Sequence, residues 1–264
     1  MEQLLGKEWE ITPAGGATGD AYFAEYEGKK LFLKRNSSPF LAVLSAEGIV
    51  PKLVWTKRLE NGDVFTAQQW LNGRELKPCE MGSDQVAALL RKIHTSKELA
   101  AMLMRLGKSP LPPSGLLAAL ERQQQRQPSE DRSVRKALDW LEQRVLSLPD
   151  DQRAVCHCDI NHNNWLLADD GTLYLIDWDG AVIGDPAIDI GMLLYLYIPR
   201  ARWNAWLDRY GLAWSEGLAH RIKWYTLAHA LHSLFWPKGK DRDKEREQSL
   251  HLVKRVLAGD EAEP

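Results

Sequence analysis

The first seventy residues alternate apolar and polar positions with the period of β-strands. Strand patterns run through 9–12, 21–26 and 29–34, with turn residues between them. Two more, 52–59 and 63–71, flank Asn61-Gly62, a dipeptide that favours tight hairpin turns. A short helix ending at Glu47 fits between the two groups. The pattern therefore predicts a sheet of about five strands.

From Ser83 the spacing of apolar residues becomes helical and continues to Gly107, which predicts one helix between these residues. The same spacing predicts helices over 116–127, 134–145, 203–210 and 250–257. Strand patterns return at 154–158, 164–168 and 173–177, and Asp170-Gly171 predicts a turn between the last two. We therefore expect an α+β fold with an N-terminal sheet lobe, residues 1–73, and a larger, mainly helical lobe, residues 74–264.

Composition narrows the class of protein. The 264 residues are 44% hydrophobic, enough to fill a real core. A net charge of -2 gives no basic field for a nucleic-acid partner, so none is expected. We find no charged-then-apolar leader and no apolar run of about 18 residues, and three cysteines fit a reducing compartment. These features predict a cytoplasmic protein without membrane insertion.

The polar residues His157, Asp159 and Asn164 form the pattern H-x-D-x4-N, and Asp177 follows thirteen residues later. Random order would give about 0.01 such patterns in this composition, so chance explains it poorly. The loop should place a carboxylate beside an amide oxygen, and the following hairpin should return Asp177 to them. Such oxygen ligands suit Mg²⁺.

A zinc site built from Cys156, His157, Cys158 and His162 is the alternative, because cysteine and histidine are the usual zinc ligands. On a strand, however, Cys156 and Cys158 point to one face and His157 to the other. Three such side chains cannot share a tetrahedral ion. The two cysteines are better interpreted as small buried hydrophobic residues.

The segments "HCDINHNNWLL" and "IDWDGAVIGDPAIDI" resemble the superfamily of aminoglycoside phosphotransferases, choline kinases and thiamine kinases, which has a two-lobed, protein-kinase-like fold. "KKLFLKRN" resembles its lysine-bearing third strand and "TAQQWLNGREL" its hinge. The resemblance implies ATP and Mg²⁺ as cofactors and a small-molecule alcohol as acceptor. The N-terminal part is most similar to the bacterial YtmP and CcrZ group, which implies a ribosyl or nucleoside hydroxyl as acceptor and a link to the cell cycle or replication initiation.

The resemblance also implies roles for single residues. Asp159 would orient and deprotonate the acceptor hydroxyl, with His157 as a structural hydrogen-bonding neighbour. Asp185 and Asp189 would brace this loop by accepting backbone hydrogen bonds. Asn164, Asp177 and Asp179 would hold the metal. The expected nucleotide contacts include Lys34, Glu47, Gln69 and Trp70, where Glu47 either pairs with Lys34 or lies at a helix end on the surface. Apart from the resemblance, the glycine-rich segment "GGATGD" either covers the phosphates through Gly16, Thr18 and Gly19, since glycine lets backbone N–H groups approach anionic oxygens, or forms a plain hairpin loop.

Several functions remain open at this stage. The acceptor is alternatively choline, thiamine or an aminoglycoside. A different class is a regulatory scaffold that keeps the kinase fold and binds cell-division or replication proteins. A kinase that acts on protein substrates comes third. The presence of Asp159, Asn164 and Asp177 together favours an enzyme, because a pure scaffold does not need all three.

Overall fold

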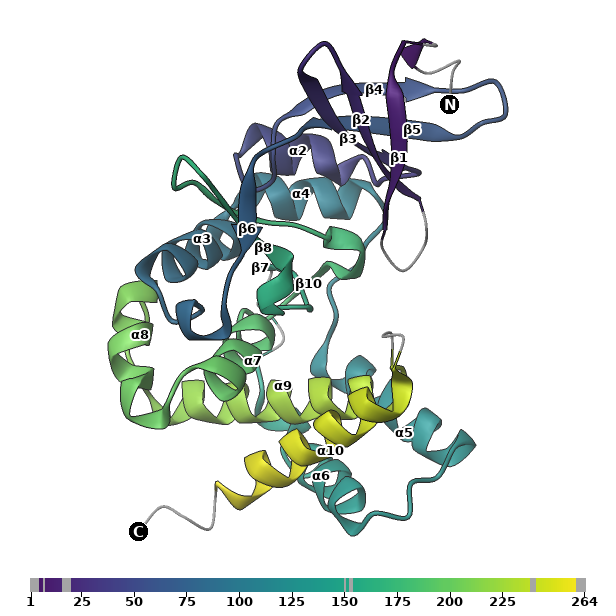
Figure 1. Ribbon diagram of the computed structural model, residues 1–264. Coiled ribbons are helices and arrows are strands. Elements are labelled where there is room, and N and C mark those ends of the chain that lie inside the picture. Colours follow the sequence, from purple (N-terminus) through teal and green to yellow (C-terminus); the bar gives the residue numbers. More distant parts are fainter. Residues whose placement is uncertain are drawn as a thin grey trace. The chain divides into compact units, whose positions relative to one another are not determined.

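The computed structural model describes residues 5–6, 8–15, 20–149, 151, 154–237 and 241–259 (Figure 1). The chain forms two compact units. We call the first, Met1–Lys77 with Asn161–Asp179, the sheet unit, and the second, Pro78–Ile160 with Gly180–Pro264, the helical unit. The hairpin after the H-x-D-x4-N motif therefore groups with the N-terminal sheet. The lobe boundary at residue 73 stays a prediction.

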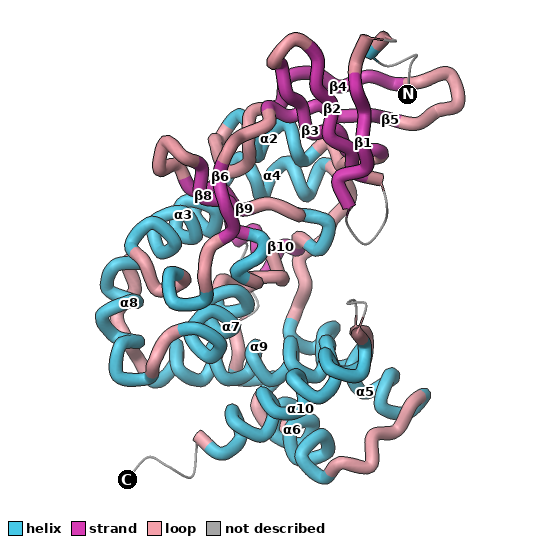
Figure 2. The backbone as a smooth tube through the Cα atoms, in the orientation of Figure 1, coloured by secondary structure: helices cyan, strands magenta, loops and turns pink. Residues whose placement is uncertain are grey.

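The sheet unit contains a five-stranded antiparallel sheet, drawn in magenta in Figure 2. Its spatial order is β1-β2-β3-β5-β4. Ala24, Leu33 and Ala67, on three neighbouring strands, form its fully buried centre. The strands are β1 (Glu10–Gly15), β2 (Ala21–Tyr26), β3 (Lys29–Arg35), β4 (Leu53–Arg58) and β5 (Val64–Gln69). The predicted five-stranded sheet is confirmed.

The turns of this sheet have the backbone conformations that the turn residues in the sequence predict. Glu27 and Gly28 join β2 to β3, and both have positive φ angles, as a two-residue hairpin turn requires. Gly62, with φ 90°, provides the same freedom between β4 and β5. Helix α2 (Phe40–Ala46) fills the connection between β3 and β4 and ends one residue before Glu47, close to the predicted end.

A second sheet in this unit has the order β6-β8-β9, with β6 (Gly73–Glu75), β8 (Trp165–Ala168) and β9 (Leu173–Leu175). The turn between β8 and β9 contains Gly171 at φ 86°, so the predicted Asp170-Gly171 hairpin is confirmed. The Leu175 amide donates a hydrogen bond to the Ile49 carbonyl at 3.0 Å, a normal length for such a bond. This bond ties β9 to the segment that follows α2.

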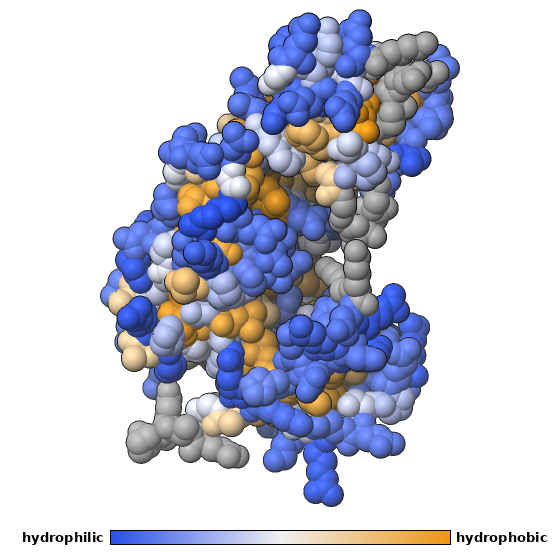
Figure 3. Space-filling model, viewed as in Figure 1, coloured by the Kyte–Doolittle hydropathy of each residue, from blue (hydrophilic) through white to orange (hydrophobic). Residues whose placement is uncertain are grey.

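Helices make up most of the helical unit. They are α3 (Asp84–Thr95), α4 (Lys97–Arg105), α5 (Pro113–Arg126), α6 (Arg132–Glu142), α7 (Ala187–Tyr197), α8 (Trp203–Tyr210), α9 (Glu216–Phe235) and α10 (Arg242–Ala258). The short strands β7 (Ala154–Cys156) and β10 (Val182–Gly184) pair antiparallel. None of the described helices combines the length and apolar character needed to cross a bilayer. Hydrophilic side chains cover most of the visible face of each unit (Figure 3).

The prediction of a single helix between Ser83 and Gly107 is wrong, because Ser96 separates two helices, α3 and α4. Ser96 has an extended backbone (φ -74°, ψ 114°), and its side chain accepts a hydrogen bond from the Leu99 amide. A serine side chain that caps a helix competes with helix continuation. The apolar spacing runs through both helices, so periodicity alone could not show the break.

Candidate active site

Lys34 and two aspartates form an ionic cluster in the sheet unit. The Lys34 Nζ, on β3, lies 3.0 Å from Asp179 Oδ2 and 3.5 Å from Asp177 Oδ1. The side chains of Asp177 and Asp179 are 56% and 65% exposed, whereas the Lys34 side chain is only 25% exposed. Lys34 thus meets two predicted site residues that lie 143 and 145 positions later in the sequence. Their carboxylates face solvent, so a ligand can reach them.

The segment that carries the two aspartates is anchored from both sides. Trp178, between them, donates its indole N–H to the Leu175 carbonyl at 2.7 Å. The Trp178 ring also packs edge-on against Phe40 of α2, with 5.8 Å between ring centroids. Asp177 itself has φ 65°, a left-handed conformation that is uncommon for residues other than glycine. This turn directs the two carboxylates towards Lys34.

Asn164 lies next to this segment. The residue ends a short 3-10 turn, His162–Asn164, directly before β8. Its backbone carbonyl accepts a hydrogen bond from the Ile176 amide at 2.8 Å. Because Ile176 immediately precedes Asp177, the bond holds these two predicted metal ligands close together, one just before β8 and the other just after β9. Metal binding by Asn164, Asp177 and Asp179 stays a prediction.

The electrostatics of the cluster fit a bound divalent cation and polyphosphate. Burial opposes the charge of Lys34, but the neighbouring carboxylates, Asp179 before Asp177, outweigh it and raise its pKa. Lys34 therefore stays protonated and balances the acidic pair. Two exposed carboxylates with an amide residue beside them are the donor set that Mg²⁺ prefers, and a fixed ammonium group suits phosphate oxygens.

The loop that carries Asp159 belongs to the helical unit and is held by Asp189 of α7. The fully buried Asp189 carboxylate accepts hydrogen bonds from the His157 amide (2.7 Å) and the Cys158 amide (2.8 Å). It also contacts His94 Nε2 of α3 at 3.0 Å. Burial works against the charge of Asp189, yet these donors keep its pKa below the ordinary value. The prediction that Asp189 braces this loop is confirmed.

Asp185 was expected to brace the same loop, and here the structure differs. One carboxylate oxygen accepts a hydrogen bond from the Ala187 amide (2.8 Å) at the start of α7. The other lies 3.3 Å from Arg221 Nε. Burial raises the pKa of Asp185. The Asp185 carboxylate thus accepts the first backbone amide of α7, a helix that begins at Ala187 after the N-cap residue Pro186.

The two residues in front of Asp159 are not in an extended strand. Strand β7 ends at Cys156, and Cys158 has φ 63°. The predicted alternation of Cys156, His157 and Cys158 between the two faces of a strand therefore does not extend to Cys158. Burial raises the pKa of the Cys156 thiol well above its ordinary value, which fits a small buried hydrophobic residue. Among the described residues, the group of potential metal ligands is His94, Cys156 and Asp189, and hydrogen bonds already occupy His94 and Asp189.

Four further predicted site residues lie within the described part of the chain: His157, Glu47, Gln69 and Trp70. The His157 side chain is completely buried, which favours the structural role. Glu47 follows α2 and is half-buried, and its pairing with Lys34 stays a prediction. Gln69 ends β5, and Trp70 is exposed next to it with its ring edge-on to Phe23. Nucleotide contact by Gln69 and Trp70 also stays a prediction.

The remaining predicted residues cannot be placed in the same way. Gly16, Thr18 and Gly19 lie outside the described residues. Asp159 is partly exposed in the helical unit, whereas Asn164 and Asp177 belong to the sheet unit. The convergence of these three residues stays a prediction that rests on the H-x-D-x4-N spacing.

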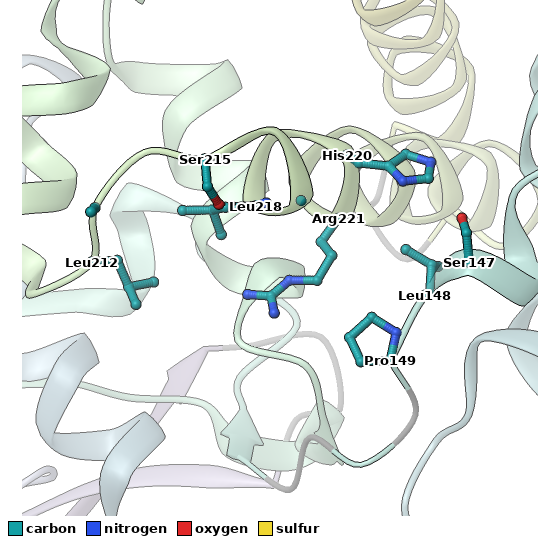
Figure 4. A pocket seen from close by; sticks show the side chains of 10 residues that line it. Ser147, Leu148, Pro149, Leu212, Ser215, Leu218, His220 and Arg221 are labelled. Carbon is teal, nitrogen blue, oxygen red and sulfur yellow. Dashed lines mark hydrogen bonds between the residues drawn. The ribbon is translucent and has the colours of Figure 1, made fainter.

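Two pockets of the described part of the chain are lined by residues other than those of the ionic cluster. A pocket of about 300 Å³ in the helical unit has Arg221 pointing into it from α9, opposite Leu212 and Pro149 (Figure 4). Another, of about 540 Å³ in the sheet unit, lies between α2, the start of β4 and Tyr174. No predicted site residue lines either pocket. The predicted chemistry is therefore associated with the exposed ionic cluster.

The chain is similar to a known protein family and to several solved structures. A family described as "Phosphotransferase enzyme family" matches residues 10–225. Choline kinase LicA from Streptococcus pneumoniae is 21% identical and has a TM-score of 0.71 over 95% of this chain and 94% of that chain. A thermostable mutant of aminoglycoside phosphotransferase APH(4)-Ia, in a ternary complex with AMP-PNP and hygromycin B, is 16% identical with a TM-score of 0.70 over 99% and 98%.

A third similar structure is spectinomycin phosphotransferase in complex with ADP and spectinomycin, 17% identical with a TM-score of 0.65 over 94% of this chain and 88% of that chain. At such identities the likeness shows the fold. The predicted two-part α+β kinase-like fold, with its N-terminal five-stranded sheet and mainly helical remainder, is confirmed.

Proposed function

Because this chain belongs to the phosphotransferase enzyme family, we propose that it transfers the γ-phosphoryl group of ATP to a hydroxyl group on a small molecule. The observation that carries this proposal is the contact of Lys34 with Asp177 and Asp179, at 3.5 and 3.0 Å. A protonated amine beside two exposed carboxylates offers one group for phosphate oxygens and two for a divalent cation. Phosphoryl transfer requires these two kinds of group.

In this proposal, Lys34 binds the α- and β-phosphates of ATP, and Asp177, Asn164 and Asp179 hold Mg²⁺. The bound cation supplies positive charge next to the phosphate oxygens. Lys34 exchanges its carboxylate partners for phosphate oxygens when nucleotide arrives. Trp178, fixed between the two aspartates, keeps both carboxylates on the side of Lys34 during this exchange.

Asp159 acts as the general base of the reaction. Its carboxylate receives the proton of the acceptor hydroxyl while the acceptor oxygen bonds to the γ-phosphorus and the bond to the ADP oxygen breaks. Asp189 holds the amides of His157 and Cys158 and so limits the positions that Asp159 can take. Placement of the hydroxyl in line with the γ-phosphate accounts for much of the expected rate enhancement.

The acceptor is best sought among choline- and aminoglycoside-type alcohols. The similar structures include a choline kinase and aminoglycoside phosphotransferases, one of them with bound hygromycin B, and these support that class over a nucleoside. Their bound AMP-PNP and ADP support ATP as the donor. The nucleoside acceptor, the YtmP and CcrZ grouping, and the link to replication stay predictions from the sequence.

The test is ADP release from Mg-ATP across a panel of choline, thiamine, aminoglycosides and nucleosides, repeated with Asp159→Asn. We expect turnover on one of the first three classes, and a loss of about 10²- to 10⁴-fold in the variant. A scaffold would bind Mg-ATP in calorimetry without turnover on any acceptor. Turnover only on nucleosides would restore the acceptor that the sequence resemblance implied.

A further inference from the structure

A chain of buried hydrogen bonds connects α8 to the loop that carries Asp159. The Tyr210 hydroxyl, on the last turn of α8, lies 2.8 Å from Nδ1 of His94 on α3. The other ring nitrogen of His94, Nε2, lies 3.0 Å from Oδ2 of Asp189. The Asp189 carboxylate in turn accepts the His157 and Cys158 amides. The three side chains that form these hydrogen bonds, Tyr210, His94 and Asp189, are all buried.

The protons of this chain follow from the acceptors and donors. The pKa of Asp189 is lowered, so its carboxylate is ionised and can only accept. His94 Nε2 must therefore carry a proton and donate it to Asp189. The other ring nitrogen, Nδ1, is then left to pair with the Tyr210 hydroxyl. Burial raises the pKa of Tyr210, so its hydroxyl keeps its proton and is uncharged beside the His94 ring.

The position of the Tyr210 hydroxyl is itself fixed. The Tyr210 ring stacks on Trp206, with 5.7 Å between centroids and 19° between planes, and Trp206 is fully buried. Gly211, with φ 97°, ends the helix directly after Tyr210. A rotation of the His94 ring by 180° would replace both nitrogens by carbons at these two bonds. The hydroxyl therefore helps to select the ring orientation in which Nε2 faces Asp189.

We propose that Tyr210 is a positioning residue for phosphoryl transfer, which acts through His94 and Asp189 on the backbone of the Asp159 loop. This inference rests on the proposed function, because it assigns Asp159 the catalytic task. Without the hydroxyl, Nδ1 of His94 loses its partner in a buried site, and the His94–Asp189 bond is held less firmly. The loop amides then leave Asp189 more often.

The test compares Tyr210→Phe with Tyr225→Phe. Both tyrosines are buried in the helical unit and have raised pKa values, so each variant removes one buried hydroxyl, but no contact of Tyr225 with His94 or Asp189 is seen in the described part of the chain. We expect Tyr210→Phe to lower kcat roughly 5- to 50-fold with KM for ATP within about twofold. Tyr225→Phe should leave kcat within about twofold. Equal kcat values for the two variants would overturn the inference.

A second measurement does not depend on turnover. Hydrogen exchange of the His157 and Cys158 amides should be faster in Tyr210→Phe than in wild type, and unchanged in Tyr225→Phe. Unchanged exchange in Tyr210→Phe would contradict the inference even in an active enzyme. If the wild-type protein shows no turnover at all, faster exchange in Tyr210→Phe than in wild type would support the Tyr210 connection while the proposed function fails.

A double-mutant cycle tests the route of this effect. If Tyr210 acts through His94, then adding Tyr210→Phe to His94→Gln should change neither kcat nor amide exchange by more than about twofold. Additive losses would show that Tyr210 acts by another route and would exclude the connection through His94.

Discussion

Replacement of Asp189 by asparagine tests the side chain that holds the loop carrying Asp159. The carboxylate accepts three hydrogen bonds, from the His157 amide, the Cys158 amide and His94, at 2.7, 2.8 and 3.0 Å. Asparagine keeps one acceptor oxygen and turns an N–H₂ group towards a buried donor. The variant loses a charge-assisted hydrogen bond and places two buried N–H donors against each other. Together these two changes should lower the free energy of unfolding by about 3–5 kcal/mol.

The assay is urea unfolding of Asp189→Asn beside Asp84→Asn. Asp84 is 77% exposed and pairs with Arg209 at the surface, so its variant should lose less than about 1 kcal/mol. Since the pKa of Asp189 is lowered, its stabilising effect is present above its unfolded pKa of about 3.9 and is lost as pH falls through the lower folded pKa. The gap between wild type and Asp189→Asn should therefore shrink in strong acid. Equal urea midpoints for the two variants at neutral pH would refute the reasoning.

Three further predictions concern single sites. Lys34→Met should raise KM for ATP at least about tenfold, measured by ADP release, because the phosphates lose their fixed ammonium partner; an unchanged KM would contradict the assignment of Lys34. Gly191→Ala should lower the free energy of unfolding by about 1–3 kcal/mol, since the added Cβ would clash with Thr226 and the Ile222 carbonyl between α7 and α9. Its control, Gly217→Ala, meets nothing within 4 Å and should not destabilise; equal effects of the two alanines in urea unfolding would argue against the close α7–α9 approach. Trp178→Phe keeps an aromatic ring but removes the indole donor, and it should raise the Mg²⁺ concentration needed for half-maximal turnover severalfold; an unchanged requirement would show that the indole bond does not matter for metal binding.

The parts of the fold that the sequence predicted well have local causes. The sheet and its hairpins could be predicted because Asn61-Gly62 and Asp170-Gly171 specify turns between neighbouring strands. Helix α9 was missed for the opposite reason. It packs against α7 and α10, and residues 222–228, which together cover every side of the helix, are all buried, so it lacks an amphipathic period.

The candidate site shows the same division. Asp177 was identified from motif spacing and Lys34 and Asp179 from the family resemblance, and the structure brings Lys34 within ion-pair distance of both carboxylates. The contacts of Tyr210 and His94 were not predicted. They join residues 116 positions apart on α8 and α3, and no local pattern encodes such a hydrogen bond. The different roles of Asp185 and Asp189 also depend on which donors the fold places beside each carboxylate.

The most direct test of the account is transfer of a labelled γ-phosphate from ATP to a choline- or aminoglycoside-type alcohol in the presence of Mg²⁺. Wild type should produce the labelled phosphate ester, and Asp177→Ala should produce none above background, because it lacks the carboxylate that is proposed to hold the cation beside Lys34. Label that stays in ATP or appears only as inorganic phosphate with wild type, or equal ester formation by Asp177→Ala, would contradict the proposed phosphotransfer.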